Sequence, residues 1–387
     1  MDKKLKIATL STSSVTIKAF FDKQFQALNE NGLETYVICA PDEKLKEFLP
    51  AETIFLPVSF TRVMSPFKDV VTLFQLIKIF RRNRFDLVQY CTLKAALLGS
   101  IAAFIVRIPV RVHLLWGLYY EGQKGINRKI FKFIAYITCS LSTHILPNSH
   151  SMAKEIIDQG IIKNPKKCEV LLNGSACGVD LDKFSMEKLK KDALGIRNKL
   201  NIKEDDVLIG VIGRLTGDKG VNEIVAAFER LSKKSDTAKL LIVGEEEEKD
   251  RLSEKTRKAI EENEKIIKIS SQRDIKPYFS AIDIFCLPSY REGFPQTPLE
   301  AQALGKPCVC TATWGSKEAV EHSITGFIVE SRNAEALIAP LTKLIENPIL
   351  RQEMGDAGRK RVERLFDSKD MLAAMIEHRM SLLSSNH

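Results

Sequence analysis

Short runs of apolar, often β-branched residues alternate along the chain with longer amphipathic stretches. This alternation is typical of parallel strands joined by helices that cover both faces of a sheet. In the first half it predicts strands at residues 7–10, 36–40, 53–56, 87–90, 110–115, 144–147 and 169–172. In the second half it predicts strands at residues 207–212, 240–243, 266–269, 284–288, 307–310 and 326–329.

The stretches between the strands predict helices, among them 15–31, 66–82, 127–141 and a last one at 368–383. Residues 186–206 are polar and rich in lysine, with few strand formers and no periodic apolar face, which indicates the join between two domains. We therefore expect an N-terminal α/β domain at 1–185 and a C-terminal one at 186–367. Each is expected to be a doubly wound parallel sheet, and the two to face a central cleft, because ligands bind at the carboxyl ends of such strands.

Composition is that of a soluble globular protein, with 44% hydrophobic and 28% charged residues in a chain of 387. The start has no signal-peptide pattern, and the most apolar run, 95–106, is shorter than the ~18 residues of a membrane span and predicts a buried helix. The eight cysteines form no CxxC pair, which predicts reduced cysteines in a cytoplasmic protein and no zinc site.

Positive charge is concentrated in the first half. The net charge of +9 lies entirely in residues 1–185, and residues 62–132 hold 13 basic but only 3 acidic side chains. Such asymmetry indicates an anionic partner, either a membrane surface, a nucleic acid or a phosphorylated substrate, unless the segment is simply a solvated basic surface. No motif of a nucleic-acid-binding protein is present in it, so no nucleic-acid partner is expected.

A glycine-rich loop follows the first strand of the second half, at residues 210–220. It is neither a Walker A loop nor a GxGxxG dinucleotide motif. Gly213 and its neighbours allow close approach of a ligand, while Arg214 and Lys219 place two cations near a helix start, where an anion is favoured. The loop suits a diphosphate, and the alternative is an ordinary turn with two solvated cations.

Two carboxylates, Glu292 and Glu300, lie on either side of a strand–loop–helix junction. Thr297 at the N-cap, Pro298 at the first helical position and Glu300 at the third predict a helix start, so a capping box is the structural alternative for Glu300. Glu292 precedes a glycine in a loop and has no comparable structural role. The backbone amides of residues 294–296 are expected to face an anion.

Together, the 213–220 loop, the Glu-Gly-Phe-Pro segment starting at Glu292, its spacing to Glu300 and the Ala-Leu-Gly-Lys-Pro run at 303–307 resemble the signature of retaining glycosyltransferases of family 4. The likeness is strong over 207–329 and weaker at 147–149, 173–174 and 178–180. It implies the GT-B fold of two Rossmann-like domains, with a C-terminal helix, 368–387, that packs back on the first domain. It also implies a hexosyltransferase-type enzyme that uses a nucleotide-sugar donor.

The resemblance assigns roles to individual residues. Arg214 and Lys219 would hold the donor diphosphate and, with Glu292 beside the transferred sugar, form the catalytic set. Glu300 would bind the donor ribose, and Arg273 would lie beside the nucleobase. The remaining donor-binding positions that it implies are Gly213, Gly293, Phe294, Pro295, Gln296 and Leu299. Because two cations already face the leaving group, we expect neither a metal nor another cofactor.

The first domain departs from the family pattern. Its first strand–helix loop lacks glycine, although Ser13 and Ser14 could still contact an acceptor. Trp116 stands where many relatives have a histidine, and His113 falls inside a strand pattern, which favours a buried core histidine. Glu121, in an aromatic loop, is a further acceptor-side candidate.

These features predict a retaining enzyme that moves a sugar, with UDP favoured by family habit, to an oligosaccharide or lipid-linked glycan in surface polysaccharide biosynthesis (capsule, lipopolysaccharide or exopolysaccharide). The aromatic and cationic stretch 66–84 predicts peripheral binding to the cytoplasmic membrane face. Two alternatives remain open: a sugar-nucleotide epimerase on the same fold, which needs no acceptor, and an inactive nucleotide-sugar-binding protein, which would bind the donor without turnover.

Overall fold

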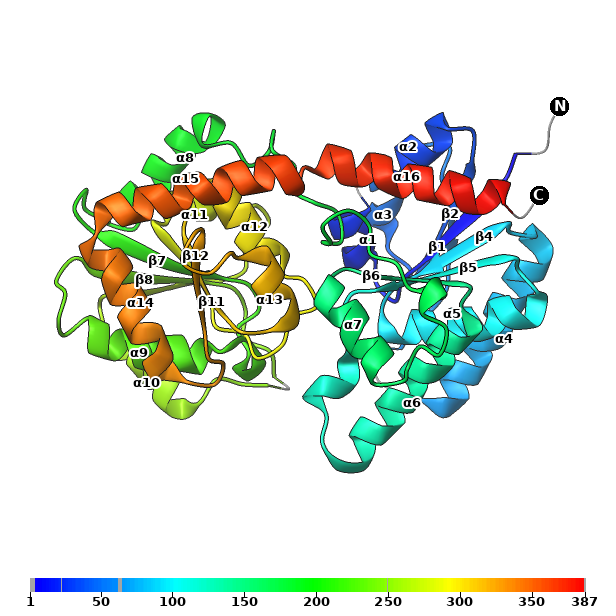
Figure 1. Ribbon diagram of the computed structural model, residues 1–387, viewed down its shortest axis with the longest axis horizontal. Coiled ribbons are helices and arrows are strands. Elements are labelled where there is room, and N and C mark those ends of the chain that lie inside the picture. Colours follow the sequence, from blue (N-terminus) through cyan, green and yellow to red (C-terminus); the bar gives the residue numbers. More distant parts are fainter. Residues whose placement is uncertain (1–3, 22, 62–64, 249, 386–387) are drawn as a thin grey trace. The chain divides into compact units, whose positions relative to one another are not determined.

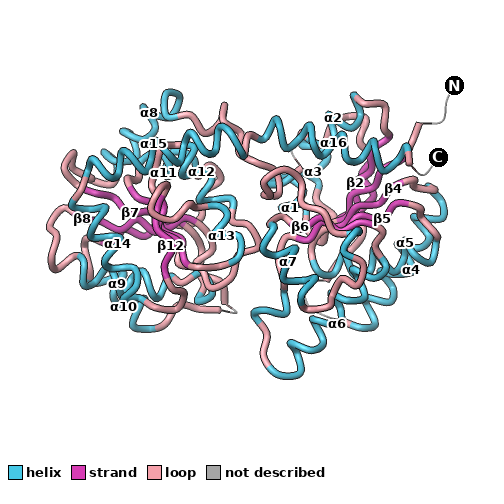
Figure 2. The backbone as a smooth tube through the Cα atoms, viewed as in Figure 1, coloured by secondary structure: helices cyan, strands magenta, loops and turns pink. Residues whose placement is uncertain are grey.

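The computed structural model describes residues 4–21, 23–61, 65–248 and 250–385. The chain divides into two compact units, residues 1–177 with 369–387, and residues 178–368. In each unit the described residues form one six-stranded parallel sheet between layers of helices (Figures 1 and 2). The strand orders are β3-β2-β1-β4-β5-β6 and β12-β11-β10-β7-β8-β9, so the order reverses beside β1 and beside β7. A reversal of this kind opens a crevice at the carboxyl edge of the sheet.

The first unit contains strands β1 (Lys6–Leu10), β2 (Glu34–Cys39), β3 (Ile54–Pro57), β4 (Leu87–Tyr90), β5 (Val110–Leu115) and β6 (His144–Pro147). Its helices are α1 (Ser14–Phe20), α2 (Gln24–Glu30), α3 (Glu43–Phe48), α4 (Pro66–Asn83), α5 (Leu93–Val106), α6 (Gly125–Leu141), α7 (His150–Asp158) and α16 (Ser368–Ser384), with 3-10 turns η1 (Tyr119–Gly122) and η2 (Pro165–Lys167). Figure 1 shows α2, α3 and α16 on one face of this sheet and α4, α5 and α6 on the other.

The second unit contains strands β7 (Val207–Ile212), β8 (Ala238–Val243), β9 (Ile266–Ile269), β10 (Ile284–Leu287), β11 (Cys308–Thr311) and β12 (Gly326–Val329). Its helices are α8 (Met186–Lys199), α9 (Val221–Leu231), α10 (Glu254–Glu262), α11 (Lys276–Ala281), α12 (Gln296–Ala303), α13 (Trp314–Ala319), α14 (Ala334–Glu346) and α15 (Pro348–Leu365), with the 3-10 turn η3 (Gly217–Lys219). Strands β7 and β10, at the centre of the sheet, are buried along their whole length, as parallel strands covered on both faces must be.

Two sequence predictions are wrong at the join. The stretch 186–206 is not a linker, because 186–199 form α8, which buries Leu189 and Ala193. Residues 178–185 also belong to the second unit, since Val179 exchanges backbone hydrogen bonds with Phe366 and Ser368 at 2.7 and 2.9 Å. Gly178 allows this contact, because a Cβ there would lie 2.8 Å from the Phe366 carbonyl oxygen.

Two elements of the first unit also differ from the prediction. Residues 169–172 form no strand, because Leu172 takes a left-handed φ of 49° that ends the extended run after one bridge between Ile145 and Cys168. The predicted helix 15–31 is two helices, α1 and α2. The apolar run 95–106 lies in α5 as expected, and among the described residues no helix has the length and apolarity to cross a bilayer.

Candidate active site

The loops that follow β7 and β10 meet at the carboxyl edge of the second sheet, beside the reversal of strand order. Their contact depends on Gly220, which has φ +71°, and whose added Cβ would lie 2.0 Å from the Pro288 carbonyl oxygen. The backbone N–H of Tyr290 and the hydroxyl of Ser289 both donate to the Asp218 carbonyl oxygen, at 2.8 and 3.3 Å. Glycine at position 220 therefore lets the two loops form one surface.

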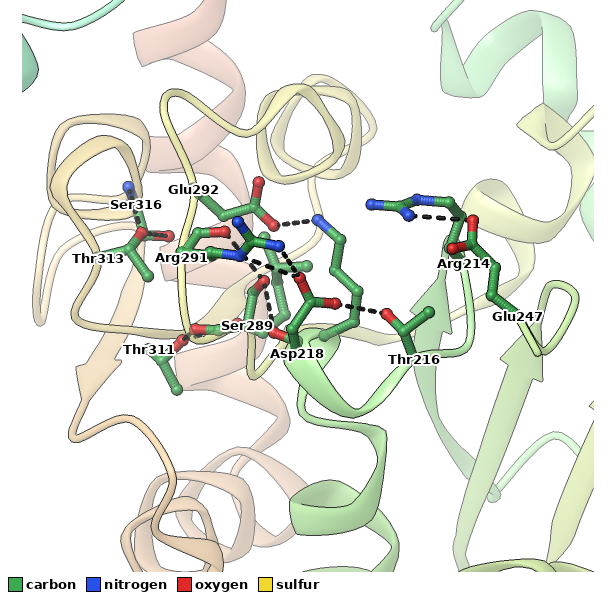
Figure 3. Close-up of polar contacts among 12 residues, drawn as sticks. Arg214, Thr216, Asp218, Glu247, Ser289, Arg291, Glu292, Thr311, Thr313 and Ser316 are labelled. Atoms are coloured by element: carbon green, nitrogen blue, oxygen red, sulfur yellow. Dashed lines mark hydrogen bonds and ion pairs between the residues drawn. The ribbon is translucent and has the colours of Figure 1, made fainter. Parts of the chain in front are cut away.

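Lys219 and Glu292, predicted separately as ligand-binding residues, form an ion pair across these loops. The Lys219 Nζ lies 2.6 Å from the Glu292 Oε1, and the two side chains are only 22% and 14% exposed. Figure 3 shows the Glu292 carboxylate directed over the loop that carries Asp218 and Thr216. The lysine thus has its charge partly shielded from water and fixed in place before any ligand arrives.

Asp218, which the sequence reasoning passed over, organises the same loop. Its carboxylate accepts from the Thr216 hydroxyl at 2.6 Å and from the Nε and Nη2 of Arg291 at 3.1 and 2.9 Å. Burial acts to raise the pKa of Asp218, but these hydrogen bonds outweigh burial and lower it. Figure 3 shows Asp218 between Arg291 and Thr216, joined to each by dashed lines. The sequence feature that could have identified Asp218 is its place between two glycines and next to Lys219, in the Gly-Asp-Lys-Gly run at 217–220.

Arg214 is held far less tightly than Lys219. Its Nη1 lies 3.0 Å from the Glu247 Oε1, but the two side chains are 58% and 46% exposed. Exposed pairs of this kind contribute only ~0–1 kcal/mol. The guanidinium can therefore leave Glu247 for an anionic ligand at little cost.

Glu300 is not a capping residue, so that structural alternative is wrong. Helix α12 begins at Gln296 with Pro295 at the N-cap and no side-chain cap, which places Glu300 in the second turn. Pro298 is tolerated because the first-turn N–H groups of a helix have no partner within it. Half-burial raises the pKa of Glu300 to about 7, against a smaller lowering effect of Lys276. In the described chain this carboxyl has no hydrogen bond or ion pair, which leaves it available to a ligand.

The segment 293–299 contributes backbone rather than side chains. Phe294 packs against Phe366 with ring centroids 5.6 Å apart, and Leu299 is fully buried. The Gln296 amide donates to the Gly178 carbonyl oxygen, and Pro295 has no N–H. Gly293 packs closely against α13, because a Cβ added at Gly315 of that helix would lie 2.1 Å from the Gly293 carbonyl oxygen. The packing fixes the course of this loop beside Glu292.

Arg273 is exposed on the loop after β9 and makes none of these contacts. Its neighbour Asp274 pairs with Lys276 at 2.6 Å. Tyr290, not singled out from the sequence, donates its hydroxyl to Glu223 at 2.6 Å and lies under the Arg332 guanidinium. These contacts stiffen the loop after β10 from its other side.

The candidates in the first unit have local partners. Ser13 caps α1, accepting from the Val15 N–H at 3.2 Å, and Ser14 hydrogen-bonds Asp42. Trp116 is half-buried against Phe20, with ring centroids 4.9 Å apart. Both serines therefore have a structural role, whatever else they contact.

Two titratable residues of the first unit lie in β5 and in the turn that follows it. His113 is a buried core histidine, as predicted, and burial lowers its pKa to about 4. Glu121 is half-buried in η1, and its pKa is raised, chiefly by burial. Glu121 is the one of the two whose side chain is partly open to solvent.

Comparison with known proteins covers both units. A family model described as "Glycosyl transferases group 1" matches residues 193–361, and one described as "Glycosyltransferase Family 4" matches residues 24–182. The chain is 30% identical over 346 residues, 89% of each chain, to the capsular polysaccharide biosynthesis glycosyltransferase CapM of Staphylococcus aureus.

Two further proteins are similar over most of their length. One is the UDP-Gal:alpha-D-GlcNAc-diphosphoundecaprenol alpha-1,3-galactosyltransferase of Escherichia coli, 26% identical over 85% of this chain and 84% of the relative. The other is the crystal structure of Anabaena HepE with UDP and glucose, with a TM-score of 0.79 at 20% identity over 97% and 99% of the two chains.

These matches confirm the predicted GT-B fold and the predicted enzyme class, a hexosyltransferase-type glycosyltransferase. The residues that carried the resemblance, from Gly213 to Glu300, lie within the matched region. The chain therefore belongs to family 4 of the glycosyltransferases.

Proposed function

We propose that this enzyme transfers a hexosyl group, with retention of anomeric configuration, from a nucleotide sugar to a lipid-linked glycan during assembly of a surface polysaccharide. UDP is the favoured nucleotide. The names of the two curated relatives support the pathway and the acceptor class, since one acts in capsule biosynthesis and the other on a diphosphoundecaprenol-linked sugar. The UDP bound in the HepE structure supports the nucleotide.

The observation that carries the proposal is the Lys219–Glu292 pair with Arg214 on the neighbouring turn. Transfer breaks the bond between the anomeric carbon and the diphosphate oxygen, and that oxygen keeps the electron pair. Lys219 and Arg214 stabilise the charge that gathers on the leaving diphosphate. Glu292, on the other side of Lys219, stabilises the positive anomeric centre. The acceptor hydroxyl supplies the oxygen of the new bond and passes its proton to the leaving diphosphate oxygen.

Glu300 completes the donor site in this proposal. A half-buried carboxyl with no protein partner is costly unless a ligand donates hydrogen bonds to it. Two ribose hydroxyls supply such donors, and they would favour the ionised form of a group whose pKa is about 7. Because two cations already face the leaving group, we propose that the reaction needs no metal.

We further propose that the first unit binds an anionic membrane surface. Helix α4 buries Thr72, Leu76 and Phe80 on the sheet but exposes Phe67 and Phe74. Helix α6 carries no acidic residue and exposes a second apolar group: Ile126, Ile130 and Phe133. Both helices begin near the carboxyl edge of the sheet, where an acceptor would enter. Cations beside exposed aromatic residues favour an anionic lipid surface, at ~1 kcal/mol for each cation.

Sedimentation with phosphatidylglycerol vesicles tests the membrane proposal. Binding should be clear at low salt, weaken at ~0.5 M salt because of screening, and fall when Arg81, Arg82 and Arg84 become Ser. Changing Arg230, Lys233 and Lys234 to Ser removes the same charge from the second unit and should leave binding unchanged. No binding at low salt would refute the proposal.

The transfer itself is tested with an undecaprenyl-diphosphate-linked sugar and a panel of α-linked UDP- and GDP-sugars. We expect a product whose new linkage is α by NMR, formed from a UDP-sugar. A β-linked product would refute retention. Conversion of the UDP-sugar without an acceptor would favour the epimerase, and donor binding with no product from any acceptor would favour the inactive binding protein.

A further inference from the structure

The segment that follows β8 packs along the glycine-rich loop of the donor site. The Gly213 N–H donates to the carbonyl oxygen of Val243, the last residue of β8, at 3.0 Å, and the Leu215 N–H donates to that of Glu245 at 2.8 Å. Gly244 allows this approach, because a Cβ added there would lie 1.8 Å from the Gly213 carbonyl oxygen. Side chains on the segment after β8 therefore stand next to the loop that carries the two donor-site cations.

Four consecutive glutamates, at 245–248, occupy this segment. Acidic groups beside a site for a diphosphate weaken binding, because like charges repel. Two of the four have partners away from the site: Glu245 accepts from the Ser271 N–H at 3.1 Å, and Glu246 accepts from the Leu252 N–H at 2.9 Å. The last one, at 248, is exposed and makes no hydrogen bond or ion pair within the described residues. The remaining glutamate faces a cation of the donor site.

That glutamate is Glu247, the partner of Arg214. Figure 3 shows its carboxylate beside the Arg214 guanidinium, joined to it by a dashed line, on a loop other than the one that carries Arg214. A carboxylate and a phosphate offer the same kind of anionic oxygens to a guanidinium. Glu247 thus holds an N–H group of Arg214 that the leaving diphosphate would use. Because both side chains are about half exposed, the guanidinium is free to change partners.

We propose that Glu247 is a positioning residue that holds the Arg214 guanidinium in the empty enzyme and competes with the diphosphate for it. This competition lowers the affinity of the site for the nucleoside diphosphate and so speeds release of that product after transfer. The role of Glu247 rests on the proposed function, because it takes the contact between Arg214 and the diphosphate as given. An exposed ion pair shifts an equilibrium only a few-fold, which sets the size of the effect.

Calorimetry with UDP on the full chain, in buffer with EDTA, compares the native protein with Glu247→Gln. We expect the variant to bind UDP ~3- to 10-fold more tightly, because the competing charge is gone and the side chain keeps its size. In stopped-flow measurements UDP release should slow by a similar factor, since differences in affinity between variants of one site appear mostly in the dissociation rate. The free energy of unfolding in urea should stay unchanged, because the pair is exposed.

Two further variants separate competition for Arg214 from a general effect of charge. Glu248→Gln removes the same charge from the next residue and should alter UDP affinity less than ~2-fold, because the charge is exposed and screened by salt. In an Arg214→Met background Glu247→Gln should also have less than a ~2-fold effect, because the guanidinium for which Glu247 competes is absent. An equal tightening with and without Arg214 would overturn the proposal, in favour of direct repulsion between Glu247 and the diphosphate.

Unchanged or weaker UDP binding by Glu247→Gln would overturn the proposal, as would an equal tightening in Glu248→Gln. Failure of the native chain to bind UDP would refute the UDP-dependent function proposed above. UDP binding that Glu247→Gln leaves unchanged would overturn the role of Glu247 alone and leave the donor site intact.

Discussion

Lys219 and Arg214 carry the same charge on one loop but differ in burial, and this difference separates their effects on stability from their effects on catalysis. We predict that Lys219→Met lowers both turnover and stability, whereas Arg214→Met lowers turnover alone. Breaking a fully buried pair costs ~3–5 kcal/mol, and an exposed pair is worth ~0–1 kcal/mol. Because Lys219 and Glu292 are 22% and 14% exposed, Lys219→Met should cost an intermediate ~1–3 kcal/mol.

The expected catalytic loss is similar for the two variants. Removing one group that stabilises the charge of a transition state costs ~2.7–4 kcal/mol, or roughly 100- to 1,000-fold in rate. We therefore expect kcat/KM for the donor to fall by at least ~100-fold in each variant. The two variants lose a similar factor in kcat/KM only if both cations contact the diphosphate.

Steady-state kinetics with the donor and urea unfolding of the same preparations give the two quantities. Arg230→Met is the matched control, because Arg230 pairs with Glu335 on the exposed surface of the same unit. That control should alter neither quantity. Near-normal turnover in both Lys219→Met and Arg214→Met would refute the diphosphate assignment, and an unchanged free energy of unfolding in Lys219→Met would refute the structural role of its pair.

Three further predictions concern the same unit. Burial raises the pKa of Glu300 from 4.5 to about 7 in the folded chain, so its ionisation lowers the stability of the fold as pH rises between these values. At pH 8, Glu300→Gln should therefore unfold at a higher urea concentration than the native chain. At pH 4.5 the two should unfold at the same concentration. The same variant should bind donor more weakly, and unchanged affinity would remove the ribose assignment. Gly220→Ala should lose ~1–2 kcal/mol or more of stability and most activity, because φ at this position is +71° and the added Cβ would lie 2.0 Å from the Pro288 carbonyl oxygen. The control Gly195→Ala in α8, where an added Cβ meets no atom within 4 Å, should be neutral or stabilising in the same urea unfolding assay. Chelation with EDTA should leave turnover unchanged, and activity that is abolished by EDTA and restored by magnesium would contradict metal-free transfer.

The central parallel strands were predictable because they are buried on both faces and so appear as continuous apolar runs, as β7 does. Helix α8 was not, because only two of its positions, Leu189 and Ala193, are buried and the rest of its sequence is polar. The false strand at 169–172 had suitable residues, but Leu172, in the segment after η2, takes a left-handed φ that its residue type does not predict. The local sequence pattern therefore predicts the strands of the two sheets, whereas tertiary contacts determine the structure of the segments that connect them.

The site was predictable as a set of residues but not as a geometry. Lys219 and Glu292 were each expected to meet the ligand, yet their pairing joins loops after different strands and no local spacing encodes it. Glu300 had the local pattern of a capping residue, and only the earlier start of α12 at Gln296 shows that the pattern is not used.

A crystal structure of the protein with bound UDP tests the central claim most directly. The account predicts the diphosphate within hydrogen-bond distance of the Lys219 Nζ and the Arg214 guanidinium, with the ribose hydroxyls donating to the Glu300 carboxylate. UDP bound away from the carboxyl edge of the second sheet, or bound there with none of these three side chains in contact, would contradict it.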